Sequence, residues 1–216
     1  IVLEDDVITS PGFLEYMNDA LDLYENEEKV MHISGYMYPH EKKLPETVFF
    51  NVPYPGGGWA TWERAWQFYI SDTEYLYNYF DTAVKWRRFN RFGGDFLQSQ
   101  LIRNRTGELK SWFVKWHGTL QIRGGITLYP GISLANNIGF DDSGSNCLES
   151  VKFNVGKLAD HITVSKISIR ENREVSRLVK RFYQGPLSLK KEVYSLLTRF
   201  IRKDKLQRVK RKLTGK

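Results

Sequence analysis

The chain has 216 residues, of which 41% are hydrophobic and 14% aromatic, a composition that excludes a disordered chain and fits one substantial core. It has no apolar run long enough for a transmembrane helix, and its single cysteine, Cys147, excludes an internal disulfide and favours a reducing compartment. Residues 177–216 hold 14 Lys or Arg against 2 acids, whereas residues 1–176 hold 18 basic and 23 acidic residues, so a slightly acidic body precedes a basic tail.

The chain opens with strand-forming residues that run directly into acids. Ile1, Val2 and Leu3 predict a buried strand, and Glu4-Asp5-Asp6 follow at its end. Adjacent carboxylates repel each other, and a divalent cation is one way to offset that repulsion; a solvated acidic turn is the alternative. Because the chain starts inside an apparent core strand, without Met or a polar leader, we expect a fragment whose N-terminal part is absent.

Short strands and helices then alternate, which favours a layered α/β fold. The patterns predict helices over 13–28, from Trp59 onward, over 72–89 and over 95–103, and strands over 30–34, 47–52 and 126–129. Residues 112–121 fit either a helix or a strand. Loops are expected over 35–47, 53–58 and 136–147.

The end of the chain has a different pattern. From Ser188 onward, apolar residues recur at helical spacing and basic residues surround them. This helix either packs on the body or lies on an anionic membrane surface. Nucleic-acid binding is not expected, because the tail lacks interleaved exposed aromatics. We divide the chain into a domain over 1–150 and a basic, mainly helical extension over 151–216.

A glycine-rich loop precedes a cluster of tryptophans. Gly57 and Gly58 would let the backbone approach a ligand, and the indole of Trp59 has flat faces suited to a sugar ring. Core packing is the alternative. We favour packing for Trp62 and Trp66 and a site role for Trp59.

The polar loop over 136–147 is a third candidate. It follows a predicted strand, so Asp141 or Asp142 is placed to reach a cation or hydroxyl groups. Cys147 has no evident activating partner, so a nucleophilic role is not expected, and no zinc-ligand spacing occurs.

These three segments, in this order, resemble nucleotide-sugar glycosyltransferases of the GT-A fold. The segment from Glu4 to Tyr16 is similar to the N-acetylglucosaminyltransferase I family. The stretches 31–36, 58–62 and 137–141 resemble a bacterial group of sugar transferases linked to surface polysaccharide synthesis. The resemblance implies that residues 1–150 form the C-terminal part of a GT-A, Rossmann-like domain with a mixed sheet, followed by the basic helical tail.

The resemblance also implies roles for single residues. Asp6 would be the main ligand of Mn²⁺ or Mg²⁺ on the donor diphosphate, with Glu4 and Asp5 on ribose, sugar or metal-bound water. The donor and acceptor pocket would include Gly57, Gly58, Trp59 and Asp141. Transfer to a glycan or lipid-linked acceptor would invert the anomeric carbon. The expected location is the cytoplasm, with the tail at the inner face of the cell membrane as one alternative.

Two departures from the resemblance affect the chemistry. Related sequences often carry Asp after the Ser-Trp pair, where this chain has Phe113, so Asp95 becomes the candidate base, with Glu63 as the next choice. Relatives also often carry His where Asn146 stands. These departures motivate the alternative of a catalytically impaired carbohydrate-binding or scaffold module of the same fold.

Overall fold

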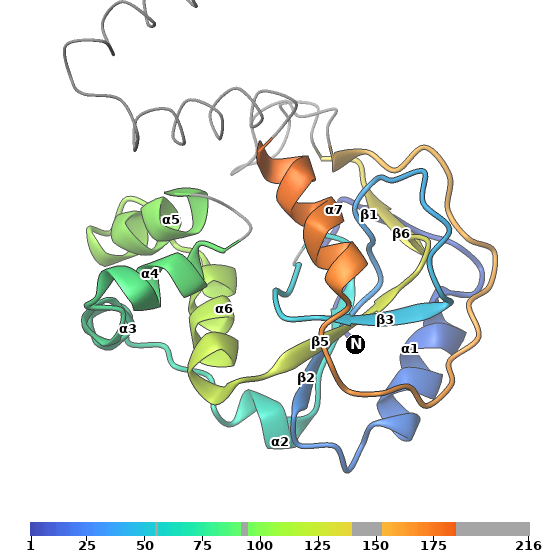
Figure 1. The fold of residues 1–216 in the computed structure, drawn as a ribbon, viewed down its shortest axis with the longest axis horizontal. Coiled ribbons are helices and arrows are strands. Elements are labelled where there is room, and N and C mark those ends of the chain that lie inside the picture. Colours follow the sequence, from blue (N-terminus) through green and yellow to red (C-terminus); the bar gives the residue numbers. More distant parts are fainter. Residues whose placement is uncertain (55, 92–94, 140–152, 185–216) are drawn as a thin grey trace, which may run out of the picture. The chain divides into compact units, whose positions relative to one another are not determined.

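The computed structural model describes residues 1–54, 56–91, 95–139 and 153–184 (Figure 1). The chain divides into two compact units, residues 1–180 and 181–216. The first unit has a mixed α/β architecture with a mixed sheet, which confirms the expected fold class at this level. Among the described residues, no helix has both the length and the apolar character needed to cross a membrane. The apolar stripe expected from Ser188 onward lies outside the described residues.

The central sheet has four strands in the order β3-β5-β2-β4. Their bounds are Val30–Ser34 for β2, Thr47–Phe50 for β3, Trp59–Ala60 for β4 and Ile126–Pro130 for β5. The two central strands, β2 and β5, run parallel, while β3 and β4 pair antiparallel at the edges. All four strands are buried along their length, which explains the nearly continuous apolar runs of β3 and β5 in place of an alternating pattern.

A two-stranded antiparallel ribbon lies beyond the C-terminal end of β2. It pairs β1 (Val7–Thr9) with β6 (Ala135–Asn137). The backbone N–H of Leu134 donates to the carbonyl of Gly35, the residue after β2, at 2.9 Å. This bond fixes the ribbon to the carboxyl end of a central strand.

Helix α1 (Phe13–Leu23) covers one side of the sheet. Phe13, Tyr16, Met17 and Ala20 are buried at helical spacing and join the main core cluster with residues of β2, β3 and β5. The helix expected over 13–28 ends five residues early. Tyr24 follows it and is buried, and its hydroxyl donates to the carbonyl of Ser165 at 3.3 Å.

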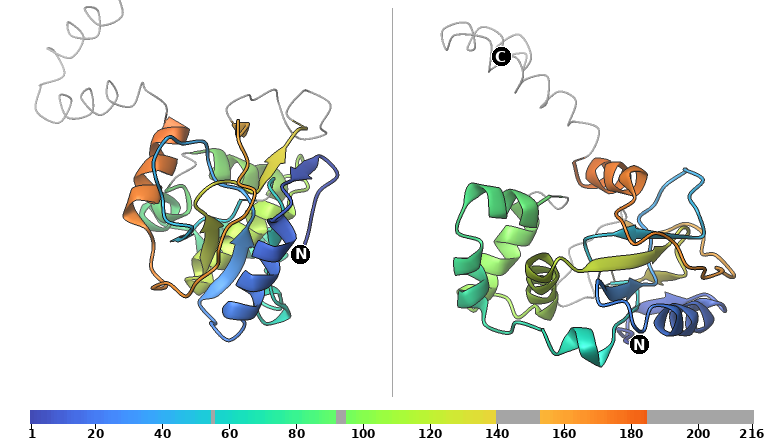
Figure 2. Two further views of the ribbon diagram at one scale, coloured as in Figure 1. Left: turned by 90° about the vertical axis from the view of Figure 1, so that its right-hand side faces the viewer. Right: turned by 60° about the horizontal axis from the view of Figure 1, so that its bottom comes forward.

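Five helices of the described residues lie between β4 and β5 in the chain. They are α2 (Glu63–Trp66), α3 (Thr73–Tyr79), α4 (Ala83–Phe89), α5 (Asp95–Arg105) and α6 (Trp112–Arg123). Helices α3 to α6 share a core of their own, formed by Leu76, Phe80, Phe89, Leu97, Leu101 and Val114. They lie together at one end of the sheet (Figure 2). The ambiguous segment 112–121 is thus helical.

Two more predicted helices were wrong in extent. The single helix over 72–89 is two helices, because the Thr82 side chain accepts from the backbone N–H of Lys85 at 3.2 Å and starts a new one. The helix predicted from Trp59 begins only at Glu63. Trp59 and Ala60 instead pair with the edge of β2.

Residues 153–180 pack on the same unit as the first 139 residues. Ile162 is buried in the main core cluster, and the N–H of Gly12 donates to the carbonyl of Asp160 at 3.0 Å. The backbone N–H of Asn172 donates to the carbonyl of Phe49 at 2.8 Å, and helix α7 (Arg173–Gln184) begins at the next residue. The part of α7 that belongs to the first unit, residues 173–180, lies on the side of the sheet opposite α1 (Figure 2). The compact unit therefore extends 30 residues past the boundary expected at 150.

Candidate functional site

The three acids lie in a turn that precedes a strand. The N–H of Val7 donates to the carbonyl of Glu4 at 3.3 Å, and β1 begins there. Glu4 and Asp5 are exposed, whereas Asp6 is half-buried. Within the described ranges, none of the three forms an ion pair with Lys or Arg. Desolvation raises the pKa of Glu4 above its ordinary value, and the charges of Asp6 and Asp5 raise it further.

The predicted buried strand at the start of the chain is wrong. Ile1, Val2 and Leu3 are 47%, 42% and 47% exposed. Val2 alone forms a bridge, with reciprocal backbone bonds to Trp59 at 2.8 and 3.0 Å. The prediction failed because strand-forming residues become a buried strand only where other segments cover both their faces.

The Val2 bridge places the acids beside the glycine-tryptophan loop. Gly58 has a φ of 66°, and its carbonyl accepts from the N–H of Gly35 at 2.9 Å. A Cβ at Gly58 would meet the side chains of Leu3 and Phe13 at 2.7 Å, and one at Gly57 would collide with Tyr36. Close packing of protein side chains therefore accounts for both glycines without a ligand.

Trp59 is enclosed by other aromatic rings and is only 5% exposed. Its ring stacks with His32 at 5.3 Å and with Trp112 at 4.8 Å between centroids. Its indole Nε1 is buried and has no hydrogen-bond partner among the described residues. In this conformation the ring does not provide a free platform for a sugar.

A second indole from the same segment does reach the surface. Trp66 is 37% exposed and stacks nearly parallel on Tyr69, with centroids 4.7 Å apart and planes 8° apart. The expectation that Trp62 packs holds, since its Nε1 donates to the carbonyl of Leu21 at 3.1 Å and its ring is partly buried against the main core. Packing was also expected for Trp66, and its ring does contact those of Trp59 and Trp116, but it is the most exposed of the three tryptophans in this segment.

The polar segment after β5 meets Asp6. The N–H of Ile138 donates to the backbone carbonyl of Asp6 at 2.8 Å, and the side chain of Asn137 accepts from the N–H of Gly139 at 2.8 Å. A Cβ at Gly139 would collide with the Asp6 carboxylate. Oδ1 of Asp6 is buried and accepts no hydrogen bond from any described residue. Gly139 therefore leaves the space that this carboxylate occupies.

The structure thus gathers three segments that are far apart in the sequence. The acidic turn lies between the two other segments. Val2 pairs with Trp59 at the Gly58–Trp59 edge, and the backbone carbonyl of Asp6 accepts from the N–H of Ile138 in the Asn137–Gly139 segment. We call this arrangement the acidic-turn site. In the described part of the chain, no group of three or more His, Cys, Asp or Glu residues is arranged to hold a metal ion.

Of the two candidate bases, Glu63 lies away from the acidic-turn site. Glu63 is exposed at the start of α2, two residues after Thr61, whose hydroxyl donates to the carbonyl of Met31 at 2.7 Å near the N-terminal end of β2. The acidic-turn site lies at the opposite end of that strand, so the structure does not bring Glu63 to it. Asp95 is the first residue of α5. Asp141, with Asp142, Asn146 and Cys147, lies outside the described residues.

Sequence reasoning missed a buried histidine at this site. His32 in β2 stacks on Trp59, and its Nδ1 accepts from the Nε1–H of Trp116 at 3.1 Å. Because indole nitrogen only donates, the imidazole is neutral with its hydrogen on Nε2. Burial lowers the pKa of His32 to about 3, with a backbone hydrogen bond at Tyr54 acting in the opposite direction. The sequence does indicate this residue, because a histidine stands inside the apolar run of the strand predicted over 30–34.

The comparisons with known proteins add no relative. No protein-family model matches this chain, and no curated protein sequence matches it.

Proposed function

We propose that this chain carries the metal- and sugar-binding part of a GT-A-type glycosyltransferase. The reaction would move a sugar from a nucleoside-diphosphate donor to an acceptor hydroxyl with inversion. The meeting of Asp6, the Gly58–Trp59 edge and Asn137–Gly139 carries the proposal. This meeting occurs beyond the carboxyl end of β2, and ligands of open α/β sheets bind outside the carboxyl ends of the strands.

The acidic-turn site fits a hard divalent cation in one respect. Asp6 presents a buried carboxylate oxygen that has no donor among the described residues. Mg²⁺ is commonly bound by one or two carboxylates together with substrate phosphates, so a group of three protein ligands is not required. Mn²⁺ or Mg²⁺ at this position would stabilise the negative charge that develops on the departing nucleoside diphosphate.

The remaining residues of the proposal have separate tasks. Glu4 and Asp5 are exposed beside Asp6 and are placed to accept hydrogen bonds from ribose or sugar hydroxyls. Asp95 remains our candidate for the base that takes the proton from the acceptor hydroxyl.

A carbohydrate-binding role without catalysis is the second candidate. The observation in its favour is the Trp66–Tyr69 stack, which leaves Trp66 37% exposed. Flat aromatic surfaces bind the apolar faces of sugar rings. In this alternative, sugar binding would need neither Asp6 nor a metal.

One experiment separates the two candidates. Hydrolysis of a panel of nucleotide sugars is measured with and without Mn²⁺ for the wild type, Asp6→Asn and Asp19→Asn, with Mn²⁺ binding followed by electron paramagnetic resonance. Asp19 is the matched control, because it is an exposed aspartate on α1. We expect Asp6→Asn to lose roughly a hundredfold or more of the Mn²⁺-dependent hydrolysis and to weaken Mn²⁺ binding, with Asp19→Asn unchanged.

Equal Mn²⁺-dependent turnover in Asp6→Asn and the wild type would contradict the role of Asp6. Sugar binding that is independent of metal, in the absence of any donor hydrolysis, would favour the second candidate. Loss of that binding in Trp66→Ala would locate it on the aromatic stack.

A further inference from the structure

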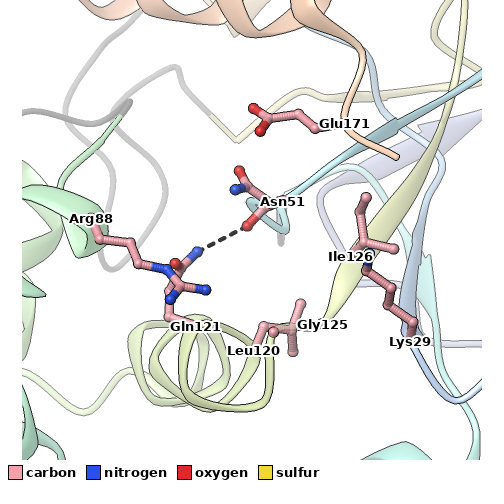
Figure 3. Close-up of a pocket in the computed structure, with 9 residues that line it drawn as sticks. Lys29, Asn51, Arg88, Leu120, Gln121, Gly125, Ile126 and Glu171 are labelled. Carbon is pink, nitrogen blue, oxygen red and sulfur yellow. Dashed lines mark hydrogen bonds between the residues drawn. The ribbon is translucent and has the colours of Figure 1, made fainter. Parts of the chain in front are cut away.

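A separate polar pocket lies at the opposite end of the sheet from the acidic-turn site. It has a volume of about 180 Å³ and opens where β5 begins and α6 ends (Figure 3). Lys29 precedes β2 and Ile126 begins β5, so the pocket is at the N-terminal ends of the two central strands. The two ends of the five-residue strand β2 lie roughly 13 Å apart, so the pocket and the acidic-turn site are separated by about that distance along the strand. The pocket is therefore distinct from the acidic-turn site.

Two cationic side chains of this pocket have no ion-pair partner in the described part of the chain. They are Lys29 and Arg88, and Arg88 points toward Gln121 (Figure 3). The one acid in the lining, Glu171, is already engaged: its carboxylate accepts from Nη1 of Arg91 at 2.9 Å and from the hydroxyl of Ser176. The local charge balance therefore favours an anion.

Helix α4, which carries Arg88, is held in place beside the pocket. The next residue, Phe89, is buried, and its carbonyl lies 3.0 Å from Nε2 of His117 on α6. The Phe89 ring also packs edge-on against His117, with centroids 4.7 Å apart. Arg88 thus projects from a fixed helix, which lowers the entropic cost of ordering it around a ligand.

The same pocket also offers hydrogen-bond acceptors. Oδ1 of Asn51 is buried and accepts no hydrogen bond from a described residue, while the Asn51 carbonyl accepts from Nε2 of Gln121 at 3.0 Å. Gly124, with a φ of 68°, caps the end of helix α6. The Leu120 carbonyl accepts from the backbone N–H groups of Gly124 and Gly125, whereas the carbonyls that follow it in the last turn have no intrahelical donor. These oxygens suit hydroxyl donors on a ligand.

We propose that this pocket binds a small anion that carries hydroxyl groups, of the size of a monosaccharide phosphate or a sugar acid. The anionic group would bind Lys29 and Arg88, and hydroxyls would donate to Asn51 Oδ1 and to the end of α6. The pocket volume of about 180 Å³ is below that of pockets that hold drug-sized ligands, so the ligand must be smaller than those. This proposal does not depend on glycosyl transfer at the acidic-turn site.

The test measures binding of four probes to the whole chain by calorimetry: glucose 6-phosphate, gluconate, glucose and inorganic phosphate. Glucose 6-phosphate and gluconate combine an anion with hydroxyls and differ in the anion, whereas each of the other two lacks one part. We expect one of the first two to bind at least about tenfold more tightly than both glucose and inorganic phosphate. Which of the two binds identifies the anion.

Arg88→Gln is the informative variant, and Arg87→Gln is its matched control. Both arginines are exposed on α4, but Arg87 does not line the pocket. We expect Arg88→Gln to weaken binding about tenfold and Arg87→Gln to leave it within about twofold. Absence of binding by all four probes up to about 10 mM would overturn the proposal, as would equal weakening by the two variants.

Discussion

Lowering the pH from 7 to 5 is expected to destabilise this fold through two buried histidines. His32 accepts from Trp116 through Nδ1, and His117 contacts the carbonyl of Phe89 through Nε2. Both imidazoles are inaccessible to solvent. Burial lowers the pKa of His32 to about 3 and that of His117 to about 4, because a charged ring would lose its hydration.

The sign of the effect follows from the order of the pKa values. The unfolded histidines titrate near 6.5, so below that pH the unfolded chain binds protons that the folded chain does not. The free energy of unfolding therefore falls as the pH falls below 6.5. At pH 5 each histidine lowers it by about 2 kcal/mol, and the two together by about 4 kcal/mol. The loss continues down to the folded pKa values, about 4 for His117 and about 3 for His32.

Urea denaturation at pH 7 and pH 5, at constant ionic strength, measures the effect directly. Carboxylates also contribute in acid, so the informative quantity is the difference between variants. In His117→Gln the amide nitrogen can still donate to the carbonyl of Phe89, but the side chain does not take up a proton. We expect the loss between pH 7 and pH 5 to shrink by about 2 kcal/mol in this variant. His161→Gln is the control, because that imidazole is 51% exposed.

Two results would refute this reasoning. One is a wild-type free energy of unfolding that is the same at pH 5 and pH 7. The other is a His117→Gln variant whose loss matches that of the wild type and of His161→Gln, since burial of a neutral imidazole would then not be the cause.

Two further predictions concern the acidic-turn site and the tail. Gly139→Ala would push a Cβ into the Asp6 carboxylate, so we expect it to lower the free energy of unfolding by about 1–3 kcal/mol and to weaken Mn²⁺ binding. Gly156→Ala is the control and should do neither, because a Cβ there would meet open space. Equal stability of the two variants in urea would contradict this prediction. Through the basic tail over 177–216, the protein should sediment with vesicles that contain phosphatidylserine, because each basic residue near the membrane surface contributes about 1 kcal/mol of binding free energy. High salt should release it. Binding that is the same without the anionic lipid would count against a membrane role.

Local patterns were sufficient for several elements. The apolar runs at 30–34 and 126–129 indicated strands, and they are the two central strands β2 and β5. The segment 95–103 indicated a helix and lies within α5. Patterns of this kind succeed because side-chain period and backbone preference are set by near neighbours in the chain.

Cap chemistry in the sequence held information that periodicity did not reveal. Asp72 accepts from the N–H of Tyr75 at 3.0 Å and starts α3, and Thr82 does the same for α4. Reading Asp72 and Thr82 as N-caps would have divided the segment 72–89 correctly. The apolar period alone continues across the break.

The sequence by itself determined the strand-forming centre of the sheet, the mixed α/β class and the three segments that carry candidate chemistry. Only the tertiary structure decided that Val2 pairs with Trp59, that β1 pairs with β6, and that Gly139 leaves room for the Asp6 carboxylate. It also decided that Trp59 is enclosed while Trp66 reaches solvent. The reason is that burial and contact depend on which distant segments cover a residue, and no local spacing specifies those partners.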